Sequence, residues 1–209
     1  MEKFVIDTNF FINLEIKSGF GNSPKEVVSG FTNLAKKLKK EGRAEFFMPP
    51  RIVEEFLGFF EEDTLIKDFL GIITLKSPNI FQLQFSAEVF YQLIDEVRQR
   101  AYRGLRIAEE AVVDGAKKII GRGELNKIEF EKKIGNTVKN LRERYRNATR
   151  VNFLDSLADL DLIMLAKEMD GFLVSSDEGV IRWGRIFGIK EMLPGLFRQR
   201  LLSLPNQKK

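Results

Sequence analysis

Four short apolar runs mark the candidate strands of this chain. They cover residues 3–6, 45–48, 71–75 and 172–175. Continuous apolar runs of this length are typical of strands buried on both faces of a parallel sheet. The first and last runs are followed by carboxylates, Asp7 and Asp177, which we therefore expect at the carboxyl edge of the sheet. Open α/β sheets place their sites at that edge.

Apolar residues at spacings of three and four predict helices between and after these runs. The expected helices cover residues 9–17, 24–41, 51–60, 160–169, 180–187 and 193–202. Residues 23–26 have the form of a capping box with Pro at the first helical position, and Gly42 follows the last turn of that helix. Gly171 is predicted to stop a later helix. The order of strands and helices predicts the α/β class with a parallel sheet.

A longer helical pattern interrupts this alternation. Residues 86–120 contain no proline and repeat apolar side chains at helical spacing, and the pattern resumes over residues 125–150 after a Gly-Arg-Gly break. We therefore expect a long helical hairpin over residues 86–150, inserted into one α/β domain formed by residues 1–85 and 151–209. A chain of 209 residues is long enough for such a domain with one elaboration.

The first hairpin helix carries a long apolar seam. The seam consists of Phe90, Leu93, Val97, Ala101 and Leu105. One face can pack on the other helix of the hairpin, but a seam of this length can also meet a second copy of the chain. The sequence therefore predicts a homo-oligomer.

Composition restricts the chemistry, because the chain has no His and no Cys. A Ser-His-Asp triad, a Cys nucleophile, a His general base and a Cys/His zinc site are all excluded. Carboxylates that hold Mg²⁺ or Mn²⁺ remain. The lack of Cys fits a cytoplasmic protein, and no apolar run approaches the roughly 18–20 residues needed to cross a membrane.

A string of three carboxylates, Asp155, Asp159 and Asp161, precedes a late apolar helix pattern. Asp155 and Asp159 are four residues apart and would share one helix face. Asp161 lies about 200° from Asp159 on an ideal helix. We therefore expect the first two to bind metal and Asp161 to be either a ligand or a supporting residue, whereas Glu54 and Glu55 are expected to form an exposed face.

The positive charge of the chain is concentrated in the hairpin. Residues 86–150 hold fifteen basic and ten acidic side chains, while the remainder holds nineteen and twenty. Lys139, Arg142, Arg146 and Arg150 follow one helix face, with Arg144 beside them and only Glu143 as a nearby acid. Because this face lacks compensating acids at i, i+4, we expect it to contact RNA phosphates.

Three signatures resemble those of the PIN-domain metal-dependent nucleases: Asp7-Thr8-Asn9 after the first strand, Asp161 opening a late helix, and Ser175-Ser176-Asp177 after the following strand. With the hairpin and the acidic string, the chain looks most similar to the minimal protein-only RNase P group called HARP. The resemblance implies an endoribonuclease that removes the 5′ leader of precursor tRNA, uses Mg²⁺ or Mn²⁺, and forms a large homo-oligomer through its helical elements. The catalytic and metal-binding aspartates of the group fall on Asp7, Asp155, Asp159 and Asp177, and Asp161 occupies the helix-start position of ordinary PIN domains. PIN domains also often add an acid from the helix that here carries Glu54 and Glu55, so the resemblance leaves open whether one of these is a ligand.

Three other functions remain open at this point. A PIN ribonuclease of the toxin type would share the acids but would not need the basic hairpin. A non-catalytic RNA-binding partner of another enzyme would keep the basic surface without needing the acids. A dehalogenase-type phosphatase also begins with a strand and Asp, but it requires a second Asp where Asn9 stands.

Overall fold

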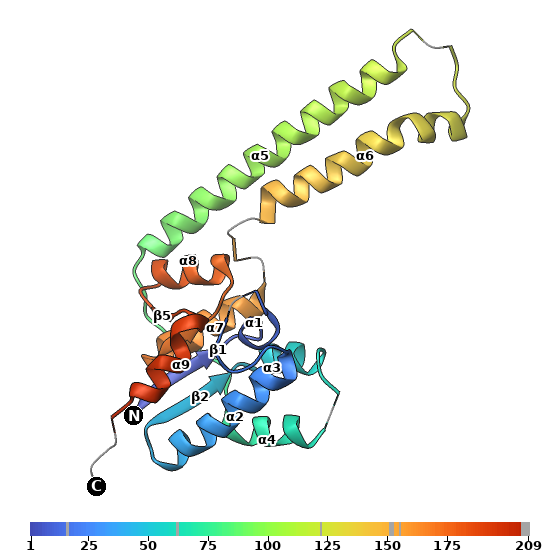
Figure 1. The fold of residues 1–209 in the computed structure, drawn as a ribbon. Helices are drawn as coiled ribbons and strands as arrows, with labels where there is room; N and C mark the ends of the chain where they lie inside the picture. The colour runs from blue at the N-terminus through green and yellow to red at the C-terminus, as the bar shows by residue number, and fades with distance from the viewer. Residues whose placement is uncertain (16, 62, 122, 151–152, 155, 206–209) are drawn as a thin grey trace. The chain divides into compact units, whose positions relative to one another are not determined.

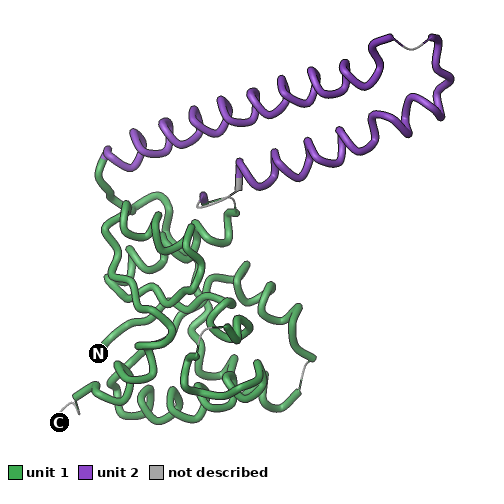
Figure 2. The backbone as a smooth tube through the Cα atoms, turned by 45° about the horizontal axis from the view of Figure 1, so that its top comes forward, with its two compact units in different colours: residues 1–86, 154–209 green, residues 87–153 purple. Residues whose placement is uncertain are grey.

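The computed structural model describes residues 1–15, 17–61, 63–121, 123–150, 153–154 and 156–205, and only the backbone of Arg150. The chain divides into two compact units, shown in different colours in Figure 2. The first unit combines residues 1–86 with residues 154–209, and the second consists of residues 87–153. No described helix has both the length and the apolar character needed to cross a membrane.

The first unit is built on a parallel sheet, which confirms the predicted α/β class. Within the described residues the sheet has five strands in the order β3-β2-β1-β4-β5. The strands are β1 (Glu2–Ile6), β2 (Ala44–Met48), β3 (Ile73–Leu75), β4 (Phe172–Val174) and β5 (Lys190–Met192). Strand β5 was not predicted, because this short edge strand reads Lys-Glu-Met and contains no apolar run.

The central strand β1 determines where the sheet can hold a site. It pairs with β2 on one side, where Phe4 faces Phe46, and with β4 on the other, where Phe4 faces Phe172. The chain therefore moves outward through β2 and β3 and then returns to the opposite side of β1. The carboxyl ends of β1 and β4 flank the point where the strand order reverses, which is where open α/β sheets bind ligands.

Seven helices surround the sheet in the described part of this unit (Figure 1). They are α1 (Asn9–Ile12), α2 (Pro24–Lys40), α3 (Pro50–Leu57), α4 (Thr64–Ile72), α7 (Leu157–Met169), α8 (Glu178–Ile186) and α9 (Pro194–Ser203). One helix was predicted too long here, and another was missed. The first helix ends at Ile12 and does not continue to residue 17, and α4 was not predicted, although Asp63 caps it by accepting a hydrogen bond from the Ile66 N–H.

Helix ends follow local chemistry. The Ser23 side chain accepts a hydrogen bond from the Glu26 N–H, as predicted for the start of α2, and the Glu26 carboxylate accepts one from the Asn22 N–H at 2.8 Å. Helix α7 ends at Met169, as predicted, and Asp170, not Gly171, takes the left-handed conformation after it, with φ of 46°. Gly171 serves close approach instead, because a Cβ there would lie 2.8 Å from the Lys3 carbonyl oxygen.

Phenylalanine side chains fill much of the core of the first unit. Phe4 on the central strand packs against Phe197 of α9 at 5.1 Å between ring centroids, and Phe31 of α2 packs edge-on against Phe46 at 5.2 Å. All four side chains are fully buried. Burial of each such ring contributes about 2–3 kcal/mol. The resulting rigid core fixes the strand ends that carry the site.

The second unit consists of two long helices, α5 (Glu88–Ile119) and α6 (Lys127–Arg150), packed against each other. The helices approach closely at Gly104, where a Cβ would lie 2.6 Å from the Tyr145 ring. Lys118 donates a hydrogen bond across the pair to the Thr137 hydroxyl at 2.6 Å. The predicted roles of this hairpin in RNA binding and assembly stay predictions.

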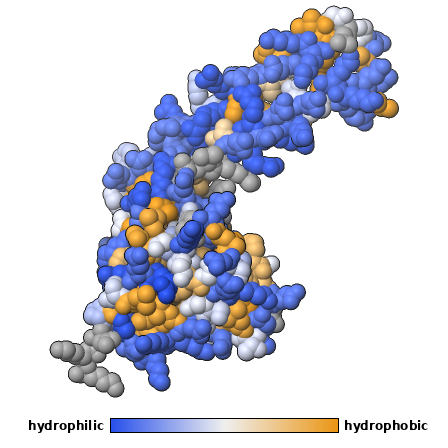
Figure 3. Space-filling model, in the orientation of Figure 1, coloured by the Kyte–Doolittle hydropathy of each residue, from blue (hydrophilic) through white to orange (hydrophobic). Residues whose placement is uncertain are grey.

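Much of the apolar surface of α5 is not covered within the chain. Several apolar side chains are at least half exposed along the helix, and orange patches interrupt the hydrophilic surface of the hairpin in Figure 3. Those on the predicted seam and beside it include Phe90, Tyr91, Ile94, Val97, Tyr102, Leu105 and Val112. Large exposed apolar patches commonly mark an interaction site.

Candidate metal-dependent nuclease site

A buried carboxylate lies at the point where the strand order reverses. Asp7 directly follows β1, its N–H donates to the Val174 carbonyl at 3.0 Å, and its side chain is 3% exposed. The Ser175 hydroxyl donates to Asp7 Oδ2 at 2.5 Å, and Asn9 donates to both carboxylate oxygens at 3.3 Å, through its backbone N–H and its side-chain amide. These donors fix the orientation of the Asp7 carboxylate.

The surroundings of Asp7 disfavour its charge. Burial raises the pKa of Asp7 to about 6, against the lowering effect of the hydrogen bonds from Ser175 and Asn9. The negative charges of Asp159 and Glu55 raise this pKa further. These three carboxylates therefore share one electrostatic environment, which a bound cation would stabilise.

Asp177 is linked to Asp7 through Ser175. The Ser175 hydroxyl oxygen accepts a hydrogen bond from the Asp177 N–H at 3.0 Å while its proton goes to Asp7. Asp177 caps α8, because its Oδ1 accepts a hydrogen bond from the Val180 N–H at 2.9 Å. The Asp177 side chain is exposed. It can therefore cap the helix with one oxygen and present the other to a ligand.

Helix α7 carries two of the three acids of the Asp155 string, Asp159 and Asp161. Ser156 caps this helix by accepting a hydrogen bond from the Asp159 N–H at 3.0 Å, so the helix begins at Leu157 and Asp159 lies in its first turn. Asp155 lies outside the described residues. Asp161 forms an ion pair with Arg51 of α3 at 2.6 Å.

The donor set fits a hard divalent cation. Carboxylate and hydroxyl oxygens are the ligands that Mg²⁺ and Mn²⁺ prefer, and the mutual repulsion around Asp7 is what such an ion would relieve. The part of the chain that the structure describes contains no group of three or more carboxylates arranged to bind a metal ion. The structure thus brings Asp7 near Asp159 and Glu55, and links Asp7 to Asp177 through Ser175.

Two residues near Asp7 were not among the predicted site residues. Glu55 was expected on an exposed face, with a site role left open by the resemblance to PIN domains; it is exposed, yet its charge raises the pKa of Asp7. The Thr8 hydroxyl explains this proximity, because it donates to the Ile52 carbonyl at 3.1 Å and so ties the end of β1 to α3. Ser175 belonged to a recognised motif but had no predicted role. Only its place beside Asp7 in the folded chain reveals one.

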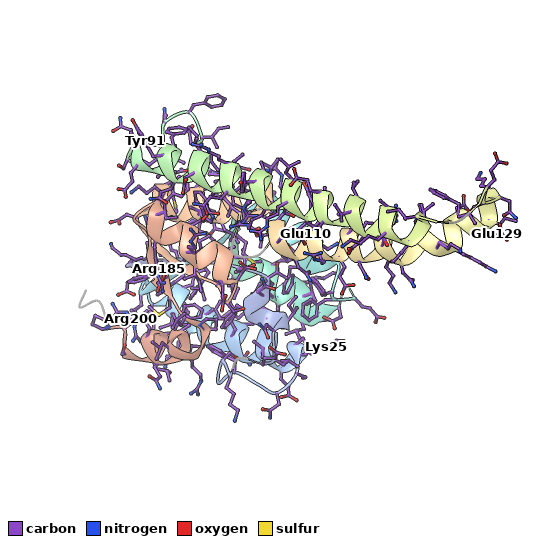
Figure 4. The ribbon with its side chains drawn as sticks, turned by 90° about the horizontal axis from the view of Figure 1, so that it is seen from above. Lys25, Tyr91, Glu110, Glu129, Arg185 and Arg200 are labelled. Carbon is purple, nitrogen blue, oxygen red and sulfur yellow. The ribbon has the colours of Figure 1, made fainter. Side chains whose placement is uncertain are left out.

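The hairpin carries a separate basic surface. Lys139, Arg142 and Arg146, here called the basic stripe, are exposed and line a hollow of about 750 Å³ along α6. Within the described residues none of the three forms an ion pair. Arg144 differs, because its guanidinium pairs with Glu110 of α5 at 2.5 Å, and Figure 4 shows Glu110 between the two helices. The structure describes only the backbone of Arg150.

Comparison with known proteins adds to this geometry. The PINc domain ribonuclease family matches residues 3–204. The RNA-free ribonuclease P of Pyrococcus horikoshii is 38% identical over 204 residues, which cover 98% of this chain and 93% of that protein. Those of Thermococcus onnurineus and Thermodesulfovibrio yellowstonii are 38% and 35% identical, covering 97% and 96% of this chain and 94% of each relative. The similarity therefore includes both units.

Proposed function

The chain belongs to the PIN-domain ribonucleases, in the group of the RNA-free ribonuclease P proteins, and we propose that it removes the 5′ leader of precursor tRNA. As a member of this family it is an endoribonuclease. The observation that carries the proposal is the buried Asp7 at the sheet reversal point, which shares its environment with Asp159 and Glu55 in a chain that matches these relatives over nearly its whole length.

PIN-domain nucleases generally depend on a divalent metal. For this chain we infer Mg²⁺ or Mn²⁺, held by Asp7, Asp155, Asp159 and Asp177, since no His or Cys is present to bind a softer metal. When bound, such an ion activates water and neutralises the charge that develops on the phosphate. Ser175 and Asn9 hold the Asp7 carboxylate in one orientation, and Ser175 couples it to the Asp177 backbone.

The basic stripe is the proposed RNA-binding surface, with Arg150 continuing the same helix face in sequence. Its three cations are exposed and free of ion pairs among the described residues, so they can meet phosphates without breaking existing contacts. Contacts of this type give affinity and position without reading base sequence. Arg144 contributes less directly, because it already pairs with Glu110.

Assembly and compartment complete the proposal. The exposed apolar side chains of α5 would be covered by other copies of the chain in a large homo-oligomer. A double substitution of Val97→Glu and Leu105→Glu should then lower the molar mass measured by light scattering, whereas an unchanged mass would remove this seam from the interface.

The cytoplasm is the proposed compartment, where precursor tRNA is processed.

The test of the function is cleavage of a 5′-extended precursor tRNA by the purified full chain in Mg²⁺. We expect one cut, mapped to the nucleotide at the mature 5′ end, that disappears with EDTA and in Asp7→Asn. Metal-dependent cuts at scattered positions would favour a general PIN ribonuclease. Tight RNA binding without any cleavage would favour a non-catalytic RNA-binding protein.

A further inference from the structure

One ion pair stands apart from the others because of its position. Arg51, in the first turn of α3, donates through its Nη1 to Asp161 Oδ2 at 2.6 Å. The Asp161 side chain is 18% exposed and that of Arg51 is 53% exposed. The carboxylate is therefore mostly covered by protein, while about half of the arginine side chain faces outward.

Three connections place Arg51 beside the nuclease site. The next residue, Ile52, accepts the hydrogen bond from Thr8, which directly follows Asp7. Glu55, whose charge acts on Asp7, lies one helical turn after Arg51 and so on the same face of α3. The partner carboxylate, Asp161, is two residues beyond Asp159 on α7. Arg51 therefore stands at the rim of the acidic edge.

A guanidinium at this rim has a chemical purpose. An edge formed by carboxylates repels the phosphate that it must cleave, and a cation beside it offsets that repulsion. A guanidinium carries five N–H donors in a planar fork that matches two phosphate oxygens. The Asp161 contact is the one hydrogen bond of the Arg51 guanidinium found among the described residues, so other donors are available to a ligand.

We propose that Arg51 binds the scissile phosphate of the RNA and that Asp161 is a positioning residue that orients the Arg51 guanidinium. This inference rests on the proposed function and adds a substrate-contacting residue to it. A half-exposed ion pair contributes little to folding stability, so stability does not account for the pair. The position of Arg51 beside the Asp7 segment does.

The same geometry separates Asp161 from the metal ligands. Its Oδ2 is engaged by Arg51, and its position lies about 200° around the helix from Asp159. In this arrangement Asp159 lies on the side of α7 toward Asp7, and Asp161 lies on the side toward α3. The two acids therefore have different tasks despite being two residues apart.

The test compares Arg51→Met, Asp161→Asn and the double variant in single-turnover cleavage of precursor tRNA at saturating enzyme. Arg51→Met should lower the rate on the order of 10²-fold, as for loss of a donor to a developing charge. Asp161→Asn should lower it about 10-fold through misplacement of the guanidinium, and the double variant should be no slower than Arg51→Met. The enzyme concentration at half-maximal rate should stay within about twofold, because other phosphate contacts hold the RNA.

A matched control is Arg200→Met, which removes a half-exposed arginine paired with Glu2 at the opposite edge of the sheet. It should cleave at the wild-type rate. Arg51→Lys, which keeps the charge and the aliphatic stem, should retain more activity than Arg51→Met. If Arg51→Met unfolds, as judged by circular dichroism, the lysine variant decides: a wild-type rate contradicts the need for the planar fork.

A second measurement needs neither RNA nor cleavage. Mn²⁺ binding to the RNA-free protein, followed by electron paramagnetic resonance, should be unchanged in Asp161→Asn and weakened in Asp159→Asn. Loss of Mn²⁺ affinity in Asp161→Asn, or a wild-type cleavage rate in Arg51→Met, would overturn the inference. A wild-type protein that does not cleave precursor tRNA would instead contradict the proposed function.

Discussion

The two units of this chain handle their polar and apolar groups in opposite ways. The α/β unit buries its apolar side chains in a phenylalanine-rich core and places a nearly inaccessible carboxylate, Asp7, at the end of its central strand. The hairpin leaves large apolar side chains such as Tyr91, Tyr102 and Val112 more than two-thirds exposed and presents uncompensated cations along α6. The α/β unit thus buries the carboxylate at its candidate site, whereas the hairpin exposes its apolar and cationic side chains.

This difference indicates which unit carries the chemistry and which unit binds the RNA. A buried carboxylate with a raised pKa is expensive to hold ionised, and it is kept in place by a rigid core and by fixed donors from Ser175 and Asn9. Two packed helices offer no comparable interior, but they offer a long surface. We therefore assign chemistry to the first unit and RNA binding to the second, and the following predictions test that division.

The largest expected effect is on cleavage. Asp7→Asn should lower the rate of precursor tRNA cleavage in Mg²⁺ by about 10³-fold or more, because the neutral amide cannot replace a carboxylate ligand. Affinity for the RNA should remain near that of the wild type. Asp170→Asn serves as control, since Asp170 is an exposed residue of the same unit in the left-handed conformation that Asn also adopts. Full activity of Asp7→Asn would refute the site.

Next in size is the effect of the basic stripe on binding. Arg142→Glu with Arg146→Glu should weaken precursor tRNA binding by about 10- to 100-fold and lower the slope of log affinity against log salt by about 2. Filter binding at several salt concentrations measures both quantities. The matched control is Lys37→Glu with Lys40→Glu on α2, two exposed lysines without ion pairs among the described residues. An equal loss of RNA affinity in the control variant would mean that the basic stripe acts only through the net charge of the protein.

A smaller effect concerns stability and pH. The pKa of Asp7 is raised from its usual 3.8 to about 6 in the fold, so protonation stabilises the folded state fully below about pH 4, and this contribution is lost as pH rises through 6. At pH 8 the ionised carboxylate costs about 3 kcal/mol. In EDTA, Asp7→Asn should therefore raise the unfolding free energy by up to that amount at pH 8 and change it little at pH 4. Urea denaturation at pH 4 and pH 8 measures the difference in unfolding free energy between Asp7→Asn and the wild type. An equal difference at the two pH values would contradict the raised pKa of Asp7.

The smallest effect is expected at the ion pair within the hairpin. Arg144 lowers the pKa of Glu110 through a hydrogen bond and its charge, but both side chains are about half exposed. Such pairs add little to stability, so Arg144→Gln should shift the melting temperature by less than about 2 °C. A larger shift, measured by calorimetry, would mean that the hairpin relies on this contact to hold its helices together.

Much of the fold could be predicted because its signals are local. Buried strands read as apolar runs, and the Ser23 cap and the long uninterrupted pattern of the hairpin depend only on neighbouring residues. The errors arose where the local sequence pattern was weak. The three-residue strand β5 has no apolar pattern, and no element was predicted between residue 60 and the strand expected at 71–75, where α4 lies.

The site was predictable only as far as residue type and strand position allowed. Asp7, Asp159 and Asp177 could be proposed because each follows a strand or opens a helix. The effect of Glu55 on Asp7 and the Arg51–Asp161 pair could not, because they join α3 to segments far away in sequence. Such contacts depend on how α3 packs against α7, which no local pattern encodes.

The division of labour is tested most directly by single-turnover cleavage measured across a range of enzyme concentrations for three proteins: wild type, Asp7→Asn and Arg142→Glu with Arg146→Glu. The account predicts that Asp7→Asn loses the maximal rate while direct binding shows an unchanged affinity. It predicts that the arginine variant keeps the maximal rate but needs about 10- to 100-fold more enzyme to reach half of it. A maximal rate that collapses in the arginine variant, or an affinity that collapses in Asp7→Asn, would contradict the separation of chemistry and RNA binding between the two units.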